Sequence, residues 1–156
     1  MKTWLLDTGP LVAYLDARDP AHEAVASCLD DFTGQLATTN AVIDEVMHFV
    51  SVGRTGPRVL AEFVAASGME VYDLCQSDEL GQAALLMEKY SDTPMDFADA
   101  TLVLLAEGLN AHRILTLDRR GFATYRTRRR RHLELVLDSG KKSRGGDLLG
   151  LWRHHR

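Results

Sequence analysis

Residues 3–15 read TWLLDTGPLVAYL, and this stretch decides the fold class of the 156-residue chain. Its first four residues are mostly apolar, which predicts a short buried strand that ends at Asp7. The Gly9-Pro10 pair then turns the chain into the apolar residues 11–15, which predict a helix. A buried strand that leads directly into a helix is typical of the first unit of an α/β domain.

The alternation of strands and helices continues along the chain. Further strands are expected at 35–38, 69–72, 113–117 and 133–137, and further helices at 21–32, 41–52, 57–67, 78–90 and 94–109. The last of these helices is apolar nearly all round, which predicts that it is buried. Asn40 is expected to cap the helix at 41–52, and Gly68 to end the helix at 57–67. The pattern predicts an α/β domain with a mainly parallel sheet that is covered on both faces.

The composition is that of one globular domain, with 46% hydrophobic and 26% charged residues. Cys28 and Cys75 lie far apart and match no ligand pattern, so neither a disulfide framework nor a zinc site is expected. No run of residues resembles a signal peptide or a membrane span. We therefore expect a cytoplasmic protein that does not associate with a membrane.

The net charge of −4 conceals two segments of opposite sign. Residues 1–125 carry 8 basic and 19 acidic side chains, whereas residues 126–156 carry 10 basic and 3 acidic ones. This asymmetry suggests that the acidic part holds cations and that the basic end meets a polyanion, although a solvated basic end explains it equally well. Residues 1–138 are expected to form the domain, and residues 139–156 a basic, flexible tail with a helical turn at 148–152.

Acidic residues occupy the positions at which an α/β sheet binds ligands. Asp7 and Asp118 each follow a predicted strand, and such sheets bind ligands beyond the carboxyl ends of their strands. Asp99 lies in the apolar helix at 94–109, where an unpaired charge would be costly, and Glu45 lies one position from the apolar stripe of its helix. Each acid alone has a structural explanation as a turn, cap or surface residue, and Asp96 can be only a helix cap. Together they predict one site.

A cluster of carboxylates needs a cation. Two carboxylates within about 4 Å of each other repel by on the order of 4 kcal/mol at an effective dielectric of about 20. A ligand set of oxygens selects a hard ion, so Mg²⁺ is expected, with Mn²⁺ as the alternative. His48, three residues after Glu45, is expected to be structural rather than a ligand.

Four segments of the chain resemble the acidic motifs of the PIN-domain ribonucleases, in particular the VapC-type toxins of bacterial toxin-antitoxin pairs. They are LLDTGPLVAYLD at 5–16, TTNAVIDEV at 38–46, PMDFADATLVLLAE at 94–107 and ILTLDRRGF at 114–122. Any one motif occurs by chance, but four in the family's order at a spacing compatible with one domain are specific.

The resemblance implies a fold, a metal and a reaction. It implies a three-layer α/β/α nuclease domain, here expected over residues 1–138, with Mg²⁺ held mainly by Asp7 and Asp99. Glu45 and Asp118 would complete the acidic pocket and orient the attacking water or accept its proton. The expected reaction is endonucleolytic hydrolysis of RNA to 5′-phosphate and 3′-hydroxyl ends. The expected partners are the RNA substrate, a cognate antitoxin and a second copy of the chain in a homodimer.

The resemblance also leaves some residues open. Thr8 matches the hydroxyl residue that commonly follows the first aspartate and is expected to bind a water molecule of the metal. Asp96 is either a supporting acid or only the helix cap. Family members often have an acid just before the Phe of the fourth motif, where this chain has Gly121. Arg126 and 128–131 extend past the usual end of the domain, and they can grip RNA phosphates, bind an acidic partner or be solvated.

Other function classes make different predictions. A noncatalytic RNA-binding or protein-binding module would keep the acids as structural groups, and its Asp7→Asn and Asp99→Asn variants would behave like the wild type. A phosphohydrolase with Asp7 as nucleophile is disfavoured, because Gly9 stands where a second aspartate is expected. A nucleotide-binding enzyme is disfavoured because the chain has neither a GxGxxG motif nor a P-loop.

Overall fold

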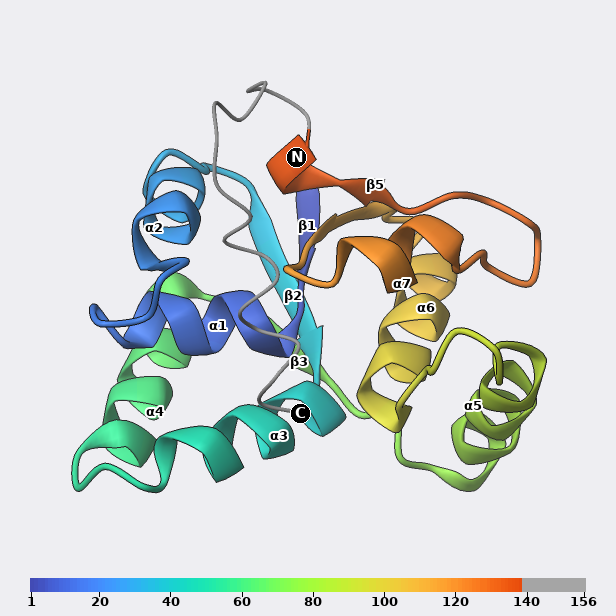
Figure 1. Ribbon diagram of the computed structural model, residues 1–156, viewed down its shortest axis with the longest axis horizontal. Helices are drawn as coiled ribbons and strands as arrows, with labels where there is room; N and C mark the ends of the chain where they lie inside the picture. The colour runs from blue at the N-terminus through green and yellow to red at the C-terminus, as the bar shows by residue number, and fades with distance from the viewer. Residues whose placement is uncertain (139–156) are drawn as a thin grey trace.

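The computed structural model describes residues 1–138 and shows a five-stranded sheet flanked by helices (Figure 1). The strands are β1 (Thr3–Leu6), β2 (Gln35–Thr39), β3 (Glu70–Tyr72), β4 (Arg113–Leu115) and β5 (Glu134–Leu135). The helices are α1 (Thr8–Leu15), α2 (His22–Asp30), α3 (Asn40–Val50), α4 (Gly56–Ser67), α5 (Ser77–Lys89), α6 (Phe97–Leu109) and α7 (Arg119–Thr124), and a 3₁₀ turn follows β5 at Val136–Asp138. The predicted tail at 139–156 and its helical turn lie outside the described residues.

The sheet is parallel throughout and has the strand order β3-β2-β1-β4-β5. Figure 1 shows α1, α2 and α4 on one side of it and α5, α6 and α7 on the other. The predicted α/β class with a mainly parallel, covered sheet is therefore confirmed. Because β1 is the middle strand, the residue that follows it emerges at the centre of the sheet's carboxyl edge.

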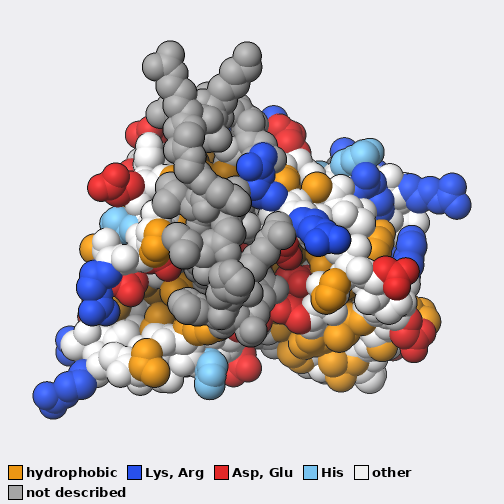
Figure 2. All heavy atoms as spheres, viewed as in Figure 1, with side chains coloured by type: hydrophobic (Ala, Val, Ile, Leu, Met, Phe, Trp, Pro, Cys, Tyr) orange, Lys and Arg blue, Asp and Glu red, His pale blue; other side chains and the backbone are white. Residues whose placement is uncertain are grey.

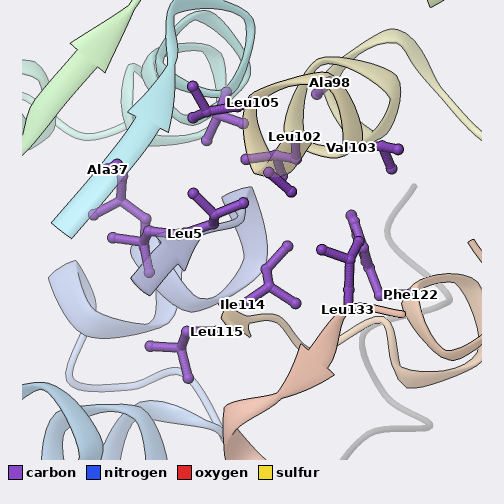
Figure 3. Packing of buried hydrophobic residues seen from close by; sticks show 14 of the residues in the cluster. Leu5, Ala37, Ala98, Leu102, Val103, Leu105, Ile114, Leu115, Phe122 and Leu133 are labelled. Carbon is purple, nitrogen blue, oxygen red and sulfur yellow. The ribbon is translucent and has the colours of Figure 1, made fainter. Parts of the chain in front are cut away.

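The core lies on both faces of the sheet. Leu5 and Leu6 of β1 are fully buried, and every residue of α6 from Ala98 to Ala106 is buried. Figure 3 shows side chains of α6, β4 and α7 meeting in this core: Leu102, Val103, Ile114 and Phe122. The prediction of a buried apolar helix is confirmed, and α6 is thus fixed rigidly against the sheet. Within residues 1–138 no helix is long and apolar enough to cross a membrane.

The structure corrects several local predictions. Thr39 rather than Asn40 caps α3, because its hydroxyl accepts the Val42 N–H at 3.2 Å, while the Asn40 side chain bonds Asp73 and the Leu74 N–H. The fourth and fifth strands end two residues earlier than predicted, at Leu115 and Leu135. The six-residue helix α7 was not predicted, because RRGFAT has no apolar periodicity. Gly68 ends α4 with a left-handed φ of 67°, as predicted.

Candidate active site

Asp7 lies at the end of the central strand with both carboxylate oxygens held. Its backbone N–H donates to the Leu115 carbonyl of β4 at 3.0 Å. Its Oδ1 accepts the Thr8 N–H at 2.8 Å, and its Oδ2 accepts the Thr116 hydroxyl at 2.8 Å. The residue is only 1% exposed. Asp7 is therefore a buried, oriented carboxylate at the carboxyl edge of the sheet, where it also caps α1.

Thr116 joins the first and fourth acidic motifs. Its hydroxyl donates to Asp7 and accepts the Asp118 N–H at 3.0 Å. Asp118 in turn caps α7, since its Oδ1 accepts the Gly121 N–H at 3.1 Å. Thr116 is buried at 1% exposure. Sequence reasoning missed this residue, although its hydroxyl two positions before Asp118 was a usable signal.

Asp96 and Asp99 form a reciprocal capping box at the start of α6. Asp96 Oδ1 accepts the Asp99 N–H at 2.8 Å, and Asp99 Oδ2 accepts the Asp96 N–H at 3.2 Å. The structural explanation of Asp96 as a helix cap is therefore confirmed. Asp99 is 1% exposed, so the capping box places a second buried carboxylate at the first turn of α6.

A buried pair of threonines holds the start of α6 against the sheet. The hydroxyls of Thr39, at the end of β2, and Thr101, in α6, share a hydrogen bond of 2.8 Å. Thr101 also donates to the Ala98 carbonyl at 2.7 Å, which leaves its oxygen to accept from Thr39. Because Thr101 is two residues from Asp99, this contact places Asp99 at the same edge of the sheet as Asp7.

Glu45 lies in α3. It is half-buried and lines a pocket of about 610 Å³ between α3 and the start of α6. The pocket is lined by Asn40, Ala41, Asp44, Glu45, His48, Cys75, Asp96, Phe97 and Ala98. The structure thus brings Glu45 and Asp96 to one cavity, and its wall contains an aromatic ring, an imidazole and several carboxylates.

The predicted acids are brought together as linked pairs rather than as a ready ligand cluster. Thr116 links Asp7 with Asp118, the capping box links Asp96 with Asp99, and the pocket joins Glu45 with Asp96. Among residues 1–138 no group of three or more His, Cys, Asp or Glu side chains is close enough to hold a metal ion. The metal-ligand and catalytic roles of these acids remain predictions.

Comparison with known proteins places the chain in a family. Residues 4–127 match the PIN domain. The chain belongs to the PIN-domain family. It is 36% identical over 124 residues to Ribonuclease VapC26 of Mycobacterium tuberculosis, a match that covers 78% of this chain and 91% of that protein. The family recognised from the four motifs is therefore confirmed, and the matched residues contain every acid of the predicted PIN-domain site.

Two solved PIN-fold structures resemble the chain in three dimensions. One is the Mycobacterium tuberculosis toxin VapC20, described as cleaving the sarcin-ricin loop, with a TM-score of 0.61 and 18% identity over 70% of this chain and 85% of that one. The other is VapBC2 of Rickettsia felis bound to a promoter DNA fragment, with a TM-score of 0.56 and 15% identity over 85% of this chain and 96% of that one. At these identities the likeness supports the PIN fold alone.

One buried polar atom of this PIN domain supports a cation beside Asp7. The Thr8 Oγ1 is buried and has no hydrogen-bond partner among the described residues. A buried hydroxyl without a partner costs about 1–3 kcal/mol, unless a water molecule or an ion satisfies it. Asp7, Asp99 and this hydroxyl all offer oxygen, the donor of hard cations. The residues of the PIN-domain site therefore fit a hard divalent ion.

The Thr116→Val variant tests whether the orientation of Asp7 and Asp118 matters for cleavage, because it removes their shared hydrogen-bond partner and leaves both charges in place. Valine has the shape of threonine but no hydroxyl, so Asp7 Oδ2 and the Asp118 N–H each lose a partner. We expect kcat for RNA cleavage to fall by about 10- to 100-fold, which corresponds to ~1.4–2.7 kcal/mol, with a smaller change in KM. Thr116→Ser keeps the hydroxyl and should stay near the wild type. Full activity of Thr116→Val would show that this link does not orient the acids.

Gly121 has a steric reason to be glycine. A Cβ at this position would lie 2.5 Å from Asp118 Oδ2 and 3.1 Å from a ring carbon of Tyr125. The close approach of Asp118 therefore explains why this chain has glycine at position 121, where family members often have an acidic residue. An acidic side chain here would displace the Asp118 carboxylate rather than add to it.

Gly121→Ala should consequently lower activity while folding is retained. We expect kcat/KM for RNA cleavage to fall by roughly tenfold, or ~1.4 kcal/mol, because Asp118 must move. Gly108→Ala is the matched control, since a Cβ there meets nothing within 4 Å and Gly108 also lies in a helix. Equal activities of the two variants, measured with both proteins folded, would contradict a catalytic position for Asp118.

Proposed function

We propose that this chain is a Mg²⁺-dependent endoribonuclease and the toxin of a toxin-antitoxin pair. The observation that carries the proposal is the placement of two buried carboxylates, Asp7 and Asp99, at the carboxyl edge of the sheet of a PIN domain. The 36% identity to a protein named Ribonuclease VapC26 supports the ribonuclease assignment, because it covers 78% of this chain and 91% of that protein.

Asp7 and Asp99 would hold the metal, and Thr8 would bind one of its water molecules. When bound, Mg²⁺ supplies charge neutralisation at the phosphate and acidifies the attacking water. An oxygen-only donor set favours Mg²⁺ or Mn²⁺ over zinc. The fixed positions of Asp7 and Asp99 support these assignments, since pre-oriented ligands do not have to be ordered during binding.

The other acids would manage water and protons. Glu45 is half-buried in the wall of the pocket, where its carboxylate can reach bound RNA, and it would accept the proton of the attacking water. Asp118 would orient that water, because the Thr116 and Gly121 hydrogen bonds hold its position. Asp96 would support Asp99 through the capping box rather than contact the reacting atoms.

The substrate would be single-stranded RNA or the loop of a folded RNA. Such a backbone can splay its bases, and the Phe97 ring in the pocket wall offers a face on which a base can stack. We further propose a homodimer, a cytoplasmic location, a nuclease domain at 1–138, and an antitoxin that inserts a cationic side chain into the acidic pocket. The likeness to VapBC2 and the acidic lining of the pocket support the antitoxin.

Expression with and without the neighbouring small gene product, followed by mapping of RNA 5′-ends, tests the proposed function. We expect growth arrest and new 5′-phosphate ends with the chain alone, and neither when the small protein is coexpressed. Asp16→Asn changes an exposed carboxylate at the far end of α1 and should remain as toxic as the wild type. Folded protein that arrests nothing and produces no new ends would favour a noncatalytic binding module.

A further inference from the structure

The loop between α7 and β5 is a rigid hairpin rich in arginine. We call residues 126–132 the arginine hairpin, since Arg126 and His132 form an antiparallel bridge at its base. Thr127 is 1% exposed; its N–H donates to the Arg131 carbonyl at 3.1 Å, and its hydroxyl accepts the Arg131 N–H at 3.1 Å. The Arg130 N–H closes the turn on the Thr127 carbonyl at 2.8 Å. The backbone of the arginine hairpin is therefore well fixed.

Three of its arginines brace the hairpin against the domain. Arg126 donates to the carbonyls of Ala123, Thr124 and Tyr125 at 2.8–2.9 Å, at the end of α7. Arg128 pairs with Glu107 of α6 at 3.1 Å, and Arg131 donates to the Asn110 side chain at 2.8 Å. These contacts give Arg126, Arg128 and Arg131 a structural role in the hairpin.

Arg129 and Arg130 remain at the exposed tip without such a role. Neither makes an ion pair within residues 1–138, although the charge of Arg129 acts on Glu107 at longer range. Arg130 has a left-handed φ of 63°. A non-glycine residue in that conformation is strained, and retained strain points to a function for the side chain. Close by, burial and then the Arg131 charge hold the pKa of His112 below its usual range.

The arginine hairpin lies at the opposite end of α6 from the acidic site. Helix α6 has 13 residues, so its two ends are about 20 Å apart at ~1.5 Å per residue. Figure 2 shows Lys and Arg side chains over α7 and the loop that follows it, beside acidic side chains in the middle of the same face. One extended ligand can therefore reach both places.

We infer that Arg129 and Arg130 bind phosphates of the RNA substrate at a second contact, remote from the cut; this inference rests on the proposed endoribonuclease function. Guanidinium groups on a rigid turn suit phosphate oxygens, which they bind through two parallel hydrogen bonds. A protein partner would need apolar anchors as well. The large apolar side chains that are exposed within residues 1–138 lie elsewhere, at Met1, Val52, Val71, Leu80 and Leu85.

The length of the RNA should decide whether the arginine hairpin takes part. A stacked strand rises ~3.4 Å per nucleotide, so a span of about 20 Å needs about six nucleotides. We would measure anisotropy of labelled 4- and 12-nucleotide RNAs with the full chain in EDTA, between 50 and 200 mM salt. The Arg129→Gln/Arg130→Gln double variant should bind the long RNA roughly tenfold more weakly, and lower its salt slope by about 1.4. Its affinity for the short RNA should equal that of the wild type.

Further variants distinguish an effect of the arginine charges on RNA binding from an effect of the backbone conformation of the turn. Arg130→Gly relieves the left-handed strain and removes the charge, so it should weaken binding of the long RNA, whereas Arg129→Lys/Arg130→Lys should largely restore it. Arg54→Gln/Arg58→Gln removes two exposed charges near the start of α4 and should change neither RNA. Unchanged affinity of the Arg129→Gln/Arg130→Gln variant, or equal losses for both RNA lengths, would overturn the inference and favour a structural or protein-binding hairpin. Failure of the wild type to cut RNA in Mg²⁺ would instead contradict the proposed function.

Discussion

Replacing Asp7 or Asp99 by asparagine should lower kcat for RNA cleavage by at least about 100-fold, or ~2.7 kcal/mol. Asparagine has nearly the shape of aspartate but no negative charge, so it cannot hold a divalent cation with the same strength. Its side-chain carbonyl can still accept the Thr8 N–H at position 7 or the Asp96 N–H at position 99. Single-turnover cleavage of a labelled RNA, with wild type and variants side by side, measures the loss.

Thermal melting of the same variants distinguishes a catalytic carboxylate from a structural one. Both residues are 1% exposed, and a buried charge is costly to the fold. In EDTA, we therefore expect Asp7→Asn and Asp99→Asn to melt at or above the wild-type temperature, as is common when active-site strain is removed. Asp16→Asn, at the far end of α1, should keep full activity. A large loss of stability with normal cleavage would mean that Asp7 and Asp99 serve the fold and not the reaction.

Removal of divalent metal should abolish cleavage and also lower the melting temperature. The two buried carboxylates and the Thr8 hydroxyl fit a cation, and a cation that binds only the folded chain stabilises it by mass action. At a Mg²⁺ concentration about 100 times its Kd, the gain is ~2.7 kcal/mol, and each kcal/mol raises Tm by about 2–4 °C in a chain of this size. Cleavage and melting would be measured in EDTA and then after addition of Mg²⁺, Mn²⁺ or Ca²⁺.

The variants again supply the control for the metal experiment. Mg²⁺ should raise the Tm of the wild type and of Asp16→Asn, but should have little effect on Asp7→Asn. Mn²⁺ should restore cleavage as Mg²⁺ does, because both ions accept oxygen ligands in similar geometry. Full cleavage in EDTA, with no melting shift on addition of Mg²⁺, would contradict both the metal and its proposed ligands.

Predictions from the sequence were most successful where the signal was local or motif-based. The strand at 3–6 and the buried helix at 94–109 follow from apolar periodicity over a few residues, and the structure confirms their types. The turn predicted at Gly9-Pro10 was wrong, because both residues lie in the first turns of α1, where proline is tolerated. The cap of α3 was wrong by one residue, because both Thr39 and Asn40 are good caps. Only the contact of Asn40 with Asp73, 33 residues away, decides between them.

For the candidate site, too, the local motifs were predicted from the sequence and the long-range contacts were not. The four motifs identified its acids and its family, and for Asp96 the sequence left a cap and a supporting acid open. The role of Thr116 was not foreseen, because its hydrogen bond to Asp7 joins residues 109 positions apart. The position of the arginine hairpin was also not foreseen, since its partners Glu107 and Asn110 lie about 20 residues away, in the last turn of α6 and at its C-cap.

By itself, the sequence determined the succession of strands and helices along the chain except for α7, the PIN-domain family, and which acidic and basic residues are candidates for the site. These properties depend on side-chain type and on spacing within one element, which a linear pattern records. The tertiary structure alone decided that Thr116 links Asp7 with Asp118, that the start of α6 is held beside the end of β2, and that the arginine hairpin lies at the other end of α6. Hydrogen bonds form between atoms about 3 Å apart, whatever their separation along the chain, and only the folded sheet brings those atoms together.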